Sequence, residues 1–241
     1  MTSEEPGYVE VTIGAPVDAV WHALRDRDQL RRWHGWHFES DGGLDREIDV
    51  IYFDDAVESA DQRTLEVQGG DVFVLSEDGE RTVVRLTRAP RTGESEWEAF
   101  YEDITEGWTT FLQQLRFAVE RHHGVDRRTL FFSGEPTATG PDVIESLGFA
   151  EAAATPVGDK YEAQTPAGLM SGEVWFRSDN QVGLTVEQWG DGLLVIGRQP
   201  ASERRPHGGG MAVLTIYGVD GAAFAAVQVE WTDWWNAAYG G

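Results

Sequence analysis

The sequence contains no cysteine and a single lysine, Lys160, among its 241 residues. The absence of cysteine excludes disulfides, thiolate nucleophiles, iron–sulfur clusters and cysteine-ligated zinc. The other basic residues are arginines, a bias from which no mechanism follows. No apolar run approaches the length that crosses a bilayer, so we expect no membrane-spanning helix.

Positive charge is scarce as well, because 19 lysines and arginines stand against 42 aspartates and glutamates, a formal net charge of −23. Binding to DNA, RNA or an anionic membrane depends on cations that neutralise phosphates, so none of these partners is expected. The chain opens with Met1-Thr-Ser-Glu-Glu, which is acidic and lacks the basic and then apolar pattern of an export signal. The expected location is therefore cytoplasmic.

The composition is that of a folded protein, with 41% hydrophobic and 11% aromatic residues. A solvated, disordered chain would have fewer of both. The length is enough for two domains of ordinary size, each able to bury a core without disulfides or a structural metal.

The first half begins with strand and helix patterns. Residues 8–13 alternate apolar and polar side chains, the period of a half-buried strand. Pro16 suits the first position of an amphipathic helix that runs to Leu24, and a second short helix is expected over 28–33. Four further stretches read as antiparallel strands, the last two joined by a turn at 77–79. They are 46–53, 62–68, 71–76 and 81–88.

The period changes again over residues 96–122, which predict one long helix. Its apolar stripe contains Trp97, Tyr101, Ile104, Trp108, Phe111, Leu112, Leu115 and Val119. The expected order is thus a strand, two short helices, several antiparallel strands and a long terminal helix.

Residues 11–24 (VTIGAPVDAVWHAL) and 30–33 (LRRW) resemble the opening of the START-like, or polyketide cyclase, superfamily. They most resemble the branch of the activator of heat-shock-protein-90 ATPase homologues, and the resemblance covers about residues 8–123. It implies an α+β helix-grip fold, in which a curved antiparallel sheet wraps around the long C-terminal helix and a cavity between them often holds an apolar ligand. In that family a glycine-rich strand pair usually follows the second tryptophan-bearing helix. This sequence departs from the family there, because residues 41–47 form a short and strongly acidic segment.

The second half repeats the first weakly. Residues 106–112 match 229–235, where Trp231, Trp234 and Trp235 belong to a second helical stripe. A short helix is expected at 141–147, and strands at 128–133, 172–177, 182–189, 193–199 and 211–217. We therefore expect a START-like helix-grip domain over 1–123 and a degenerate helix-grip-like domain over 124–241. The alternative is that the second half forms a lid or an unrelated β-rich domain.

A search for catalytic patterns finds few candidates. His34 and His37 lie near Glu39 and Asp41 and could bind a divalent ion, but the segment is loop-like and lacks the spacing of known sites. No Gly-x-Ser-x-Gly elbow, dinucleotide fingerprint or phosphate-binding loop occurs. We therefore predict no catalytic residue, no metal and no cofactor.

The ten tryptophans are the remaining clue. Most are expected to pack in the core, because large aromatic side chains dominate burial. The sharper hypothesis is an apolar pocket between helix and sheet, with tyrosine hydroxyls and indole N–H groups orienting a ligand. The proposed lining is Trp33, Trp36, Tyr52, Tyr101, Trp108, Phe111 and Leu115.

The leading functional prediction is non-catalytic binding of a hydrophobic or aromatic small molecule in this cavity. One alternative is a cyclase or dehydratase acting on a polyketide-like substrate, with groups such as His34 and Glu102 moving protons. Another is a chaperone-accessory role in which the acidic surface binds a protein partner. The sequence does not identify the ligand, the oligomeric state or the partner.

Overall fold

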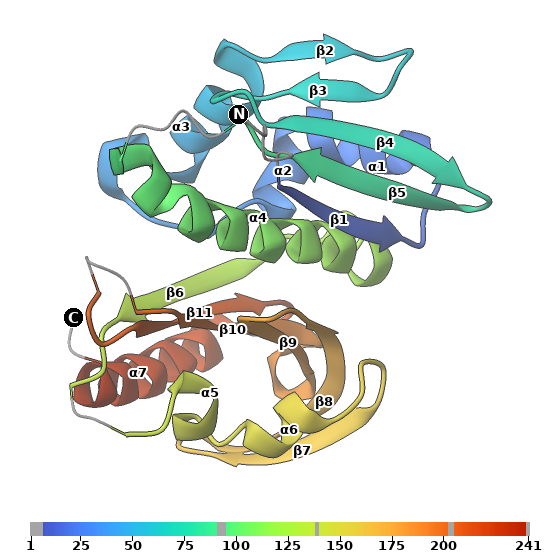
Figure 1. The fold of residues 1–241 in the computed structure, drawn as a ribbon. Coiled ribbons are helices and arrows are strands. Elements are labelled where there is room, and N and C mark those ends of the chain that lie inside the picture. The colour runs from blue at the N-terminus through green and yellow to red at the C-terminus, as the bar shows by residue number, and fades with distance from the viewer. Residues whose placement is uncertain (1–6, 91–94, 138–139, 202–204, 240–241) are drawn as a thin grey trace. The chain divides into compact units, whose positions relative to one another are not determined.

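The computed structural model describes residues 7–90, 95–137, 140–201 and 205–239, with the backbone alone for 95–100. The acidic N-terminal segment 1–5 and the side chain of Trp97 lie outside the described part. The chain divides into two compact units, Met1–Asp126 and Arg127–Gly241, and each is described by itself (Figure 1).

The first unit contains a five-stranded antiparallel sheet with the order β1-β5-β4-β3-β2. In β1 the side chains of Val11 and Ile13 are buried while Glu10 and Thr12 are exposed, as the alternating sequence predicts. The strands are β1 (Tyr8–Ile13), β2 (Val57–Ser59), β3 (Thr64–Glu66), β4 (Val72–Asp78) and β5 (Arg81–Thr87).

Three predicted helices of this unit are confirmed, namely α1 (Val17–Arg25), α2 (Arg27–Trp33) and the long α4 (Ser95–Arg121). Pro16 occupies the N-cap of α1 instead of the predicted first helical position, because the helix begins at Val17. Asp26 caps α2 by accepting a hydrogen bond from the backbone N–H of Gln29 at 2.9 Å. Figure 1 shows α4 lying alongside the sheet.

The strand predicted over 46–53 is wrong, because the chain is helical there. After the short turn η1 (Ser40–Gly42) come α3 (Gly43–Asp49) and the π-helical turn η2 (Val50–Asp54). Leu44, Ile48 and Tyr52 recur every four residues, and all three are buried. These buried residues follow the helical period, which competes in this segment with a β-branched composition typical of a strand.

The core of the first unit lies between its sheet and its helices. Leu65, Phe73 and Leu86 from the sheet pack in one cluster with Leu112 and Leu115 of α4. All five side chains are fully buried. This packing fixes α4 along the middle of its length, and a cavity lies farther towards its N-terminal end.

The second unit contains a six-stranded sheet with the order β6-β11-β10-β9-β8-β7. Its strands are β6 (Arg128–Gly134), β7 (Lys160–Thr165), β8 (Gly168–Arg177), β9 (Gln181–Val186), β10 (Gly192–Gln199) and β11 (Gly209–Ile216). Its helices are α5 (Val143–Ser146), α6 (Ala150–Ala154) and α7 (Gly221–Ala238), with the turn η3 (Glu187–Trp189) after β9. The sequence did not predict β7 or α6. The strand predicted over 182–189 is too long, because the chain leaves β9 at Val186 and forms η3.

The two units share one topology. In each, the first strand pairs with the last (β1 with β5, β6 with β11), and the remaining strands are neighbours in chain order. In each, helices follow the first strand (α1, α2 and α3 in the first unit, α5 and α6 in the second), and a long helix follows the last strand. The predicted α+β helix-grip architecture, in tandem, is confirmed by this order, and the lid alternative is wrong.

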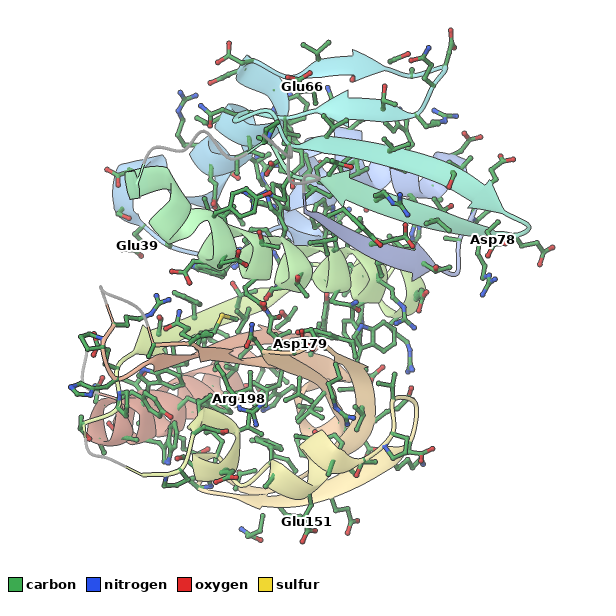
Figure 2. All side chains as sticks on the ribbon, in the orientation of Figure 1. Glu39, Glu66, Asp78, Glu151, Asp179 and Arg198 are labelled. Atoms are coloured by element: carbon green, nitrogen blue, oxygen red, sulfur yellow. The ribbon has the colours of Figure 1, made fainter. Side chains whose placement is uncertain are left out.

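Charged side chains are spread over the surface of both units. Figure 2 shows Asp78 at the tip of the β4–β5 hairpin and Glu151 on α6 pointing away from the ribbon. Within the described residues, no helix is both long and apolar enough to cross a membrane.

Candidate functional site

A cavity of about 840 Å³ opens between α4 and the neighbouring loops of the first unit. It is lined by Glu47, Ile51, Gln68, Gly69, Asp71, Arg88, Ala89, Pro90, Tyr101, Ile104, Gly107, Trp108 and Phe111. These residues come from α3 and η2, from the segment before β4, from the segment after β5 and from α4. The chain therefore brings four separate segments together around one space.

Gly107 forms part of the cavity wall in the middle of α4. A Cβ atom built at this position would meet nothing within 4 Å. Glycine inside a helix costs about 1 kcal/mol relative to alanine. The missing side chain leaves space in the cavity that most other residues would fill.

Asp71 and Arg88 form a buried ion pair at the cavity wall, with side chains only 8% and 5% exposed. Asp71 Oδ1 accepts hydrogen bonds from Arg88 Nε at 3.0 Å and from the backbone N–H of Ala89 at 2.7 Å. Asp71 Oδ2 accepts the indole N–H of Trp108 at 2.7 Å. Three donors on one carboxylate compensate its removal from water.

Arg88 also binds α4 directly. Its Nη1 donates to Thr105 Oγ1 at 2.8 Å and to the carbonyl of Tyr101 at 3.3 Å. The guanidinium carbon lies 4.6 Å from the centre of the Tyr101 ring. These contacts, together with Asp71, hold Arg88, Tyr101 and Trp108 in fixed positions around the cavity.

A second polar array reaches the cavity through Glu47. His34 Nε2 lies 3.9 Å from Glu47 Oε1, and His34 Nδ1 lies 2.9 Å from the hydroxyl of Tyr52 in a hydrogen bond whose donor depends on the imidazole tautomer. His34 and Tyr52 are fully buried, and only Glu47 lines the cavity. Burial raises the pKa of Glu47 above its ordinary value. Burial and the neighbouring charge of Glu47 raise the pKa of Tyr52 as well.

The imidazole of His34 is enclosed by aromatic rings. Ring centres lie 4.6 Å away at Phe111, 5.1 Å at Tyr52, 5.6 Å at Trp33 and 6.2 Å at Trp108. His34 is therefore placed by packing and by Tyr52, and it lies behind the cavity-lining residues Glu47, Trp108 and Phe111.

Of the seven lining residues predicted from the sequence, Tyr101, Trp108 and Phe111 line the cavity. Trp36 is half-buried with its ring 5.8 Å from that of Phe111, outside the lining set. The other three, Trp33, Tyr52 and Leu115, lie in the core. The indole N–H of Trp33 donates to the carbonyl of Ala23 at 2.8 Å, and its ring borders a smaller pocket of about 160 Å³ beside α1 and α2.

The sequence reasoning missed Glu47, Asp71, Arg88 and Gly107. A signal for Asp71 and Arg88 was present in the hairpin register. Val72 pairs with Thr87, so Asp71, just before β4, lies opposite Arg88, just after β5. Glu47 was hidden by the wrong strand prediction. Gly107, a glycine inside an apolar helical stripe, could have been read as a site of close approach or open space.

The other predicted candidates lie away from this cavity. His37, Glu39 and Asp41 are exposed, and the described residues contain no group of three or more histidines and carboxylates able to hold a metal ion. Glu102 is exposed and is not part of the cavity lining.

The interior of the second unit is filled by aromatic rings. Phe132 stacks on Trp235 and Trp231 with ring centres 5.6 and 6.1 Å apart, and Trp235 stacks on Tyr239 at 4.8 Å. The pocket beside α7, lined in part by Trp231 and Trp234, has a volume of about 10 Å³. The space that the first unit leaves open is thus occupied by side chains here.

No protein-family model matches the sequence, and no curated protein matches it. Among solved structures, DynU16, from the dynemicin biosynthetic locus, is 15% identical, with 97% of this chain and 96% of that chain covered at a TM-score of 0.35. The di-domain ARO/CYC StfQ from the steffimycin biosynthetic pathway is 9% identical over 94% of this chain and 91% of that chain, at a TM-score of 0.33.

The Aha1 dimer from Colwellia psychrerythraea is 19% identical and covers 48% of this chain and 97% of that chain, at a TM-score of 0.36. Similarity at this level transfers neither an activity nor a ligand to the chain. The strand order of the two units makes the chain a tandem helix-grip protein.

Proposed function

We propose that the protein binds a hydrophobic or aromatic small molecule in the cavity of its first unit. The observation that carries this proposal is the cavity itself, about 840 Å³ between α4 and the loops around β4 and β5. Pockets for small molecules typically measure roughly 300–1,000 Å³, with apolar walls and a few fixed polar groups. Ile51, Ile104 and Phe111 supply apolar walls of this kind.

Imperfect packing is a poor explanation of this space. Protein interiors hold few voids larger than a water molecule, because lost contacts destabilise the fold. The second unit, with the same topology, fills its interior with Trp189, Trp231 and Trp235. The first unit instead has Gly107 in the cavity wall and a buried ion pair that fixes the side chains around the space. Because these side chains are already fixed, the protein loses less conformational entropy when a ligand binds.

The test is a fluorescence titration with N-phenyl-1-naphthylamine, an uncharged aromatic probe. We expect saturable binding to the wild type and a loss of at least about tenfold in affinity for Gly107→Phe, which fills the cavity. The matched control is Gly221→Phe at the start of α7, where a Cβ also meets nothing within 4 Å. Binding that is absent from the wild type, or equal in the two variants, contradicts the proposal.

A second candidate function, acid–base catalysis of the cyclase or dehydratase type, is favoured by one observation. Glu47 lines the cavity, and its pKa is raised. Behind it lie His34, 3.9 Å from Glu47, and Tyr52, which is hydrogen-bonded to His34. A carboxyl group in this state can take a proton from a carbon beside a carbonyl, or give one to a leaving hydroxyl. Its test is turnover of poly-β-ketone thioesters by the wild type and by Glu47→Gln. Conversion that stops in Glu47→Gln favours this function, and equal rates remove Glu47 from it.

A further inference from the structure

Among the residues that the structure describes, the hydrogen bonds of Arg88 leave one end of its guanidinium group without an acceptor. A guanidinium group has five N–H donors. Nε donates to Asp71, and Nη1 donates to Thr105 and to the carbonyl of Tyr101. In the described part of the chain Nη2 donates to nothing, and it is not among the polar atoms sealed from solvent.

Arg88 lines the cavity, and its side chain is only 5% exposed. Because Nη2 keeps accessible surface in a nearly buried side chain, these observations together place the free end at the cavity. A charged N–H group makes its strongest hydrogen bonds to an ionised oxygen acceptor. An oxygen atom in the cavity beside Nη2 would supply that acceptor.

Asp71 does not accept a hydrogen bond from Nη2 as well. Its Oδ1 already accepts from Arg88 Nε and the Ala89 N–H, and its Oδ2 accepts from Trp108. Arginine and carboxylate commonly form two parallel bonds, whereas this pair forms one. Nε and Nη1 are already used, so the N–H groups of Nη2 are the ones that remain open to an oxygen acceptor among the described residues.

We propose that the cavity takes an amphipathic organic acid, whose carboxylate accepts hydrogen bonds from Arg88 Nη2 and whose apolar body lies against Ile51, Ile104 and Phe111. This inference rests on the proposed binding function and adds the chemical class of the ligand. The net charge of −23 repels anions at long range, so a preference for an acid has to come from a local contact such as this one.

The test uses displacement of N-phenyl-1-naphthylamine by two matched competitors, naphthalene-1-acetic acid and naphthalene-1-acetamide. They share one ring system and differ in a carboxylate and a neutral amide. For the wild type at neutral pH we expect the acid to compete at concentrations about tenfold lower than the amide, since a bond to a charged group adds this much.

The variants assign the preference to Arg88. The ratio of the two affinities is expected to fall to about one in the double variant Asp71→Asn/Arg88→Met, which removes both buried charges together. Arg88→Lys, which keeps a positive charge for Asp71 but lacks the planar fork, is expected to lower the ratio as well and decides the matter if the double variant does not fold.

Three outcomes separate this inference from the proposed function. If neither competitor displaces the probe and the probe itself does not bind, the proposed function is wrong. If both displace it equally from the wild type, the cavity binds apolar molecules and the acid preference is wrong. If the wild type prefers the acid and the variants keep that preference, the assignment to Arg88 is wrong.

Discussion

Trp108 donates its indole N–H to Asp71 across 2.7 Å, and this bond joins the middle of α4 to the residue that precedes β4. The same carboxylate holds Arg88, which in turn binds Thr105 and Tyr101 on the helix. One buried aspartate therefore fixes the helix, the ends of two strands and the polar part of the cavity wall.

The first prediction concerns the stability that Asp71 provides. Asp71→Ala leaves Arg88 buried without a counter-charge, which is expected to lower the free energy of unfolding by roughly 3–5 kcal/mol. The control is Asp78→Ala, which breaks the exposed pair with Arg81 and is expected to cost less than about 1 kcal/mol. Urea unfolding followed by circular dichroism measures both, and equal losses would contradict the central role of Asp71.

The second prediction compares two buried tryptophans. Trp108→Phe leaves Asp71 without one donor, whereas the indole N–H of Trp231 has no hydrogen-bond partner in the described part of the chain. Both changes lose similar ring area, so Trp108→Phe is expected to destabilise the protein by about 1–2 kcal/mol more than Trp231→Phe. The same unfolding experiment measures the difference, and a larger loss for Trp231→Phe is the result that excludes this explanation.

The third prediction concerns the helix position that keeps the cavity open. Gly107→Ala adds a methyl group where a Cβ meets nothing within 4 Å, and it removes the helix penalty of glycine. The thermal midpoint should rise, with the free energy of unfolding increased by roughly 0.5–1 kcal/mol. A lower midpoint would mean that the space beside Gly107 is closed in solution.

The fourth prediction concerns pH. The pKa of Glu47 is raised by burial above its ordinary value of 4.5, so the folded protein holds this proton more tightly than the unfolded chain does. The stability that the proton contributes is fully present below pH 4.5, the ordinary pKa, and is lost as the pH rises through the raised pKa of the folded state.

Glu47→Gln does not titrate and serves as the reference. Relative to this variant, the wild type is expected to lose stability as the pH rises from about 4 to about 8, in urea unfolding measured at each pH. A wild type that gains stability relative to the variant over this range would show that the pKa of Glu47 is lowered instead.

The order of elements could be predicted from sequence wherever one period dominated. Val9, Val11 and Ile13 alternate, and Trp108, Leu112 and Leu115 follow helical spacing, so β1 and α4 were placed within two residues of their observed ends. At 46–53 the β-branched residues suggested a strand, while Leu44, Ile48 and Tyr52 carried the helical period. In so short a segment the strand pattern and the helix pattern fit about equally well, and tertiary packing decided between them.

The candidate site was predictable only on its helical side. Tyr101, Trp108 and Phe111 lie on one face of α4, so periodicity alone brings them together. Asp71, Arg88 and Glu47 come from three other segments, and their meeting depends on strand register and on the path of η1 and α3. Tyr52 and Leu115 face the core instead. Residue type alone does not show whether a buried side chain faces the core or the cavity.

The most direct measurement of the central claim is a ¹H–¹⁵N spectrum of the tryptophan indole N–H groups, recorded during titration with N-phenyl-1-naphthylamine. Trp108 lines the cavity of the first unit, while Trp231 and Trp235 lie in the filled core of the second. We expect the Trp108 indole resonance to shift and saturate with the probe while those of Trp231 and Trp235 stay in place. A Trp108 resonance that does not move at saturating probe would contradict binding in this cavity.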